Sequence, residues 1–65
     1  MDRIYRVCNV YEDRPDNVIC YADYASVAEY IASLIEANGG KCMVVSPEEA
    51  TALGWWHSIE NGVYI

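Results

Sequence analysis

The stretch that decides the fold runs from Ser26 to Gly40 and reads SVAEYIASLIEANGG. Its large apolar residues recur at the three- and four-residue spacing of one helix face, and they are Val27, Tyr30, Ile31, Leu34 and Ile35. Ser26 and Glu29 have the spacing of a capping box, in which each side chain satisfies a backbone N–H at the helix start. Asn38-Gly39-Gly40 is a stop signal, because glycine accepts the left-handed backbone that ends a helix. We therefore predict a helix here, with its apolar stripe facing a core.

The residues before this helix predict a β-hairpin. The segment Arg3–Tyr11 is rich in Ile, Val and Tyr, which is typical of a strand. Alternation places Ile4, Arg6, Cys8 and Val10 on one face and Tyr5, Val7 and Tyr11 on the other. Neither face is cleanly polar, so we expect both to be at least partly covered. The polar run 12–17 predicts a turn, and Val18–Tyr21 predicts the returning strand.

The residues after the helix predict a second, smaller set of elements. Lys41–Val45 has the composition of a short buried strand, and Ser46-Pro47-Glu48-Glu49 has the pattern of a helix start. Gly54 ends that helix, Trp55–Ile59 has strand character, and Asn61-Gly62 predicts a hairpin turn before residues 63–65. We predict one α+β domain over residues 1–65, a small, mainly antiparallel sheet with one principal helix on one face. Its order is ββαβ, followed by a short helix and a C-terminal hairpin.

The net charge of the chain limits the classes of molecule that it is expected to bind. Ten acidic residues and four basic ones give 65 residues a formal net charge of -6. Such a surface repels nucleic-acid phosphates and anionic lipids, so we expect neither direct nucleic-acid binding nor membrane binding. A larger protein with a basic surface is the partner that this charge favours. No apolar signal core follows Met1, and no run approaches the roughly 18 apolar residues of a membrane helix, so we expect a cytoplasmic protein.

Residues for catalysis or metal binding are sparse. The chain lacks a glycine-rich phosphate loop, a paired-histidine metalloprotease motif and a nucleophile elbow, so we expect no enzyme activity and no catalytic residues. Cys8, Cys20, Cys42 and His57 can in principle form a zinc site, but structural zinc sites draw ligands in close pairs. We therefore expect no metal or cofactor and cysteines that pack in the core. Whether Cys8 and Cys20 face each other across the first hairpin stays open.

The aromatic residues point to an interface. The sequence has six tyrosines, two tryptophans and no phenylalanine. Every large aromatic ring therefore carries a polar group, which suits a position that is partly buried and partly exposed to solvent. A core this small cannot enclose all of them. The carboxylates in the predicted turn of the first hairpin can also mimic phosphates when they meet a basic groove. The alternative is that these carboxylates are simply solvated. We expect partner binding through Tyr11, Glu12, Asp13, Asp16, Trp55, Trp56 and Tyr64.

The resulting hypothesis is a non-enzymatic inhibitor or adaptor that docks on a basic surface of a larger protein, such as a nucleic-acid-binding groove. Small phage anti-defence proteins, including anti-CRISPR inhibitors, are similar in size and charge, an analogy that involves no shared motif. One alternative is a homodimer or larger homo-oligomer that binds a nucleotide-type ligand by stacking on tyrosine and tryptophan. Another is a structural subunit of a larger assembly.

Overall fold

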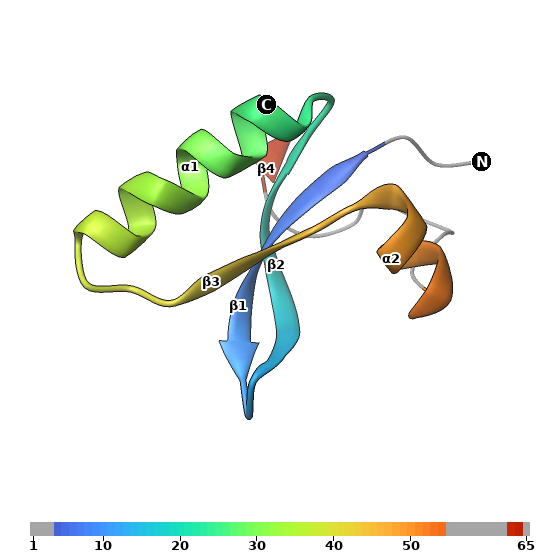
Figure 1. Ribbon diagram of the computed structural model, residues 1–65, viewed down its shortest axis with the longest axis horizontal. Coiled ribbons are helices and arrows are strands. Elements are labelled where there is room, and N and C mark those ends of the chain that lie inside the picture. Colours follow the sequence, from blue (N-terminus) through green and yellow to red (C-terminus); the bar gives the residue numbers. More distant parts are fainter. Residues whose placement is uncertain (1–3, 55–62, 65) are drawn as a thin grey trace.

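The computed structural model describes residues 4–54 and 63–64. Its elements follow in the order β1 (Tyr5–Tyr11), β2 (Arg14–Ala22), α1 (Ala25–Ala37), β3 (Cys42–Val45), α2 (Pro47–Ala52) and β4 (Val63–Tyr64), as Figure 1 shows. The strand order in the sheet is β3-β1-β2-β4, with β1 antiparallel to β2 and β3, and β4 parallel to β2. The predicted α+β class and ββαβ order are confirmed. The predicted strand at Trp55–Ile59 and the turn at Asn61-Gly62 lie outside the described residues.

The first hairpin turns more tightly than predicted. Only Glu12 and Asp13 form the turn, and both have positive φ, 53° and 61°. Two consecutive left-handed residues reverse the chain in a type I′ turn, whose twist matches that of the flanking strands. β2 therefore begins at Arg14, and our prediction of a turn over 12–17 with a strand from Val18 is wrong. Pro15 is tolerated because it stands near the start of its strand.

Two bulges lengthen β2 relative to β1, which has seven residues against nine. Val7 pairs with Cys20, but the next residue, Cys8, pairs with Val18, and a second shift follows before the pairing of Val10 with Pro15. Each shift inserts one extra residue into β2. Bulges bend a strand and increase its local twist, and the hairpin turn projects beyond the body of the sheet (Figure 1).

Helix α1 covers one face of the sheet, but not with the predicted stripe. Ala28 and Ala32 are its buried residues, and they pack with Val7, Cys20 and Ala22 of the sheet. Partly buried side chains surround this cluster, among them Val27, Ile31 and Ile35. Tyr30 and Leu34 are instead 64% and 47% exposed, so our assignment of these two residues to the core is wrong. Alanine at the contact lets the helix axis approach the sheet closely, and the larger pair is turned toward water.

The start of α1 also differs from the prediction, whereas its end does not. The N-cap is Tyr24, without a side-chain cap, so Ser26 and Glu29 lie inside the helix and form no capping box. At the other end the N–H of Gly40 donates to the carbonyl of Ile35, and Gly39 has a φ of 86°. This is the left-handed closure that the Asn38-Gly39-Gly40 signal predicts.

Helix α2 closes over the opposite face. Cys8, Val45 and Ala50 form a second buried cluster there, so both faces of β1 are covered as expected. Arg6 shares this face, only 2% exposed, with its guanidinium carbon 5.6 Å from the centroid of the Tyr21 ring. The helix start is confirmed, since Ser46 and Glu49 form a reciprocal capping box with Pro47 in the first turn.

Candidate functional site

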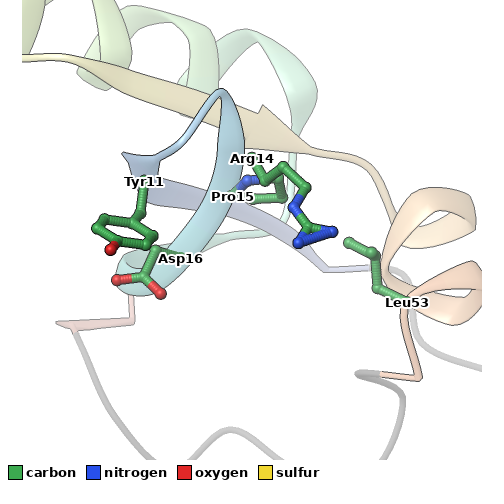
Figure 2. A pocket seen from close by; sticks show the side chains of 5 residues that line it. All are labelled: Tyr11, Arg14, Pro15, Asp16 and Leu53. Carbon is green, nitrogen blue, oxygen red and sulfur yellow. The ribbon is translucent and has the colours of Figure 1, made fainter.

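The hairpin end and the end of α2 enclose an open hollow of about 220 Å³ (Figure 2). Its lining consists of Tyr11, Arg14, Pro15, Asp16 and Leu53. The type I′ turn positions the first four residues, because it pairs Tyr11 with Arg14 across the two strands. Leu53 is the C-cap of α2, and its N–H donates to the carbonyl of Glu49 at 2.9 Å. Hydrogen-bonded backbone of both the hairpin and α2 therefore holds the lining of the hollow in place.

The lining combines opposite charges with apolar surface. Tyr11 is 66% exposed and Leu53 is 49% exposed, while Arg14 and Asp16 are also exposed. Figure 2 shows Tyr11 and Asp16 together on one side of the hollow and the guanidinium of Arg14 extending toward Leu53 on the other. Within the described part of the chain, the side chains of Arg14 and Asp16 form no hydrogen bond or salt bridge. Both charged groups are thus free to meet a ligand.

The structure brings four of the predicted partner-binding residues together. Tyr11, Glu12, Asp13 and Asp16 all lie at the hairpin end, and all are exposed. Tyr64 belongs to β4, where its backbone pairs with Tyr21. Trp55 and Trp56 lie outside the described residues. The role of all seven in partner binding stays a prediction.

Sequence reasoning missed three lining residues, namely Arg14, Pro15 and Leu53. The composition of residues 12–17 predicts a long turn that includes Arg14 and Pro15, whereas a two-residue turn pairs Tyr11 with Arg14. The signal for Leu53 is weaker. It is a large apolar residue just before the helix stop at Gly54, and it is 49% exposed.

The tyrosines support the expectation of surplus rings. Among those whose side chains the structure describes, Tyr21 is buried, whereas Tyr11, Tyr24 and Tyr30 are each more than 60% exposed. These exposed rings come from different elements: β1, the residue before α1, and α1 itself. Of these three exposed rings only Tyr11 lines the hollow, so Tyr11 is the ring that we expect to contact a partner.

Cys8 and Cys20 are buried on different faces of the sheet, and Cys42 is half-buried. Cys8 pairs with Val18 and packs under α2, whereas Cys20 pairs with Val7 and packs under α1, so they do not face each other. Burial raises the pKa of all three thiols, that of Cys8 to about 11 despite the nearby guanidinium of Arg6. Protonated, buried thiols are poor nucleophiles. Among residues 4–54 and 63–64, no three His, Cys, Asp or Glu side chains are grouped to hold a metal ion, and His57 lies outside this part.

No known family, curated protein or solved structure matches this chain. Function must therefore be argued from the site, since a fold of this kind supports many activities. The helices of the described residues are too short or too polar to cross a bilayer. What the site offers is an aromatic ring, a cation and an anion around a small hollow, beside two further exposed carboxylates at the turn.

Proposed function

We propose that this chain is a non-enzymatic binding module, an inhibitor or adaptor that docks its β1–β2 hairpin end on a basic surface of a larger protein. One observation carries the proposal: Tyr11 is 66% exposed at the projecting end of the β1–β2 hairpin, which also presents Glu12, Asp13 and Asp16. Tyrosine is among the residues that supply most interface energy, because a rigid ring buries a large area at low entropic cost.

The carboxylates contribute mainly to the rate of association. A negative patch on a chain with a net charge of -6 attracts a positive surface over long range, and salt screens this attraction. The tight turn adds rigidity, because a two-residue loop between paired strands loses little conformational freedom on binding. The chain thus combines steering by charge with an anchor that is already in place.

Two charge-reversal variants test the proposal. One carries Glu12→Lys, Asp13→Lys and Asp16→Lys at the hairpin end. Its matched control carries three reversals elsewhere: Glu29→Lys, Glu36→Lys and Glu48→Lys, at exposed positions on the helices. Each reversal changes the charge by two, so both variants have a formal net charge of zero. Circular dichroism is the control for folding, and we expect both variants to give the wild-type spectrum.

Association with the protein that the wild-type chain retains from a lysate of its source cells is then timed by biolayer interferometry. We expect the hairpin variant to associate at least about tenfold more slowly, the control to slow by only about threefold, and wild-type association to slow as salt rises. Equal effects of the two variants would show that overall charge, rather than the hairpin, governs binding. Stabilisation of the free chain by nucleotides in a thermal-shift screen would instead support the homo-oligomeric, ligand-binding alternative.

A further inference from the structure

We infer that the hollow beside Tyr11 accepts a C-terminal lysine or arginine of the partner protein. The inference rests on the proposed function, since it names the feature of the basic partner that this surface reads. Its occupant carries a positive side chain and a negative main-chain carboxylate on one residue, matching the two unpaired charges of the lining.

The side of the hollow formed by Tyr11 and Asp16 suits a cation. The two side chains lie together in Figure 2, and both are exposed. A carboxylate forms charge-assisted hydrogen bonds with an ammonium or guanidinium group, and the face of an aromatic ring attracts the same cation. Either interaction alone is common on surfaces, but their combination in one hollow selects for a basic side chain.

The opposite side suits an anion. Arg14 extends toward Leu53, away from Asp16, so its guanidinium is left to bind an incoming group (Figure 2). The planar fork of arginine matches a carboxylate through two parallel hydrogen bonds. Because Arg14 would repel an occupant that carried only a positive charge, the occupant needs a carboxylate close to its basic group. A C-terminal lysine or arginine is the simplest protein feature with both.

The size and apolar lining of the hollow agree with this occupant. A volume of about 220 Å³ is below the roughly 300–1,000 Å³ of pockets that enclose whole small-molecule ligands, so a single residue fits better than a nucleotide. Lysine and arginine also bury their aliphatic stems along apolar surface while the charged end stays hydrated. Pro15 provides such surface between the two charged sides, and Leu53 provides it beyond the guanidinium of Arg14 (Figure 2).

Peptide titrations monitored by NMR on the full, ¹⁵N-labelled chain test the inference. The probes are Gly-Gly-Arg with a free carboxylate, its C-terminal amide, Gly-Gly-Gln with a free carboxylate, and free arginine. We expect Gly-Gly-Arg to bind with a Kd on the order of 1 mM and to shift the amides of Tyr11, Arg14 and Asp16. Losing either charge, in the amide or in Gly-Gly-Gln, should weaken binding at least about fivefold.

Variants locate the contacts. Tyr11→Ala should weaken Gly-Gly-Arg binding about tenfold, and Tyr11→Phe by less than about twofold, because the ring face remains. Arg14→Gln should remove the preference for the free acid over the amide. Tyr30→Ala is the matched control, since Tyr30 is 64% exposed but lies on α1, and it should bind like wild type.

Three results would overturn the inference: no peptide-induced shifts at the hollow, equal binding of acid and amide, or equally tight binding of free arginine, which would indicate a small-molecule site. Its failure is distinguishable from failure of the proposed function. If the hairpin charge variant associates more slowly than its matched control while the wild-type chain does not bind Gly-Gly-Arg, docking stands and the terminal-residue inference falls. If the two charge variants associate at the same rate, the proposed function itself falls.

Discussion

The two-residue turn at Glu12-Asp13 makes an unusually direct prediction about stability. Glu12 has a φ of 53°, a left-handed conformation that costs an ordinary L-residue about 1–2 kcal/mol. Asparagine pays less, because its short side chain hydrogen-bonds to local backbone, and it is favoured in type I′ turns. We therefore expect Glu12→Asn to raise the free energy of unfolding by about 1 kcal/mol. For a domain this small, that corresponds to an increase in Tm of about 4–8 °C.

Two further variants test whether the gain in stability comes from the left-handed backbone at position 12. Glu12→Val should lower the free energy of unfolding by at least about 1 kcal/mol, because a β-branched residue is a severe outlier at positive φ. Glu29→Asn applies the first substitution at another exposed glutamate, inside α1. There it should lower stability by a few tenths of a kcal/mol, since asparagine is a poorer helix former than glutamate. One replacement thus has opposite effects at two exposed positions.

Urea unfolding followed by circular dichroism measures all three variants against wild type, with an unchanged m-value as evidence that the denatured state is unaffected. The expected order of stability at position 12 is Asn, then Glu, then Val. Equal stability of the asparagine and glutamate forms, together with tolerance of valine, would refute left-handed backbone at this position. It would also remove the reason why Tyr11 pairs with Arg14, and with it the geometry of the hollow.

Three further measurements probe the core, the buried thiol and the helix cap. Val7 is fully buried under α1, so Val7→Ala should lower the free energy of unfolding by about 2 kcal/mol in urea titrations, and a loss below about 0.5 kcal/mol would contradict this placement. The pKa of Cys8 is about 11 in the fold against 9.0 as a free thiol, so the fold retains a proton that the unfolded chain releases. The protonated Cys8 thiol contributes its full share of the free energy of unfolding below pH 9, and this share is lost as pH rises to 11. The free energy of unfolding of Cys8→Ala should therefore fall less steeply with pH between 9 and 11 than that of wild type. Equal slopes for the two chains would argue against burial of Cys8. Ser46→Ala removes the cap on the N–H of Glu49 and should cost about 1 kcal/mol by the same titration, whereas Ser26→Ala should cost less than about 0.5 kcal/mol, and the reverse order would restore the cap predicted from sequence.

Local signals were sufficient for several features of this chain. The start of α2 follows from Ser46, Pro47 and Glu49, whose side chains and backbone interact within one helical turn. The left-handed closure at Gly39 is equally local. The placement of Val7 and Cys8 on opposite faces follows from the two-residue period of any strand. Each depends on neighbours along the chain, and so it is visible in the sequence.

Other features depend on distant residues. Periodicity identified α1 but could not orient it, because its apolar arc is wide and only contact with the sheet selected Ala28 and Ala32 over Tyr30 and Leu34. The hydrogen-bond register of β2 against β1 likewise decided the bulges and the early start of β2, and hence the pairing of Arg14 with Tyr11.

The sequence by itself determined the class of fold, the end of α1, the start of α2 and the negative, tyrosine-rich surface, because composition and short-range geometry suffice for these. Only the tertiary structure decided that Leu53 of one helix end meets Arg14 and Asp16 of a hairpin. Their separation along the chain leaves no local pattern, and the packing of α2 beside the twisted β1–β2 hairpin brings them together.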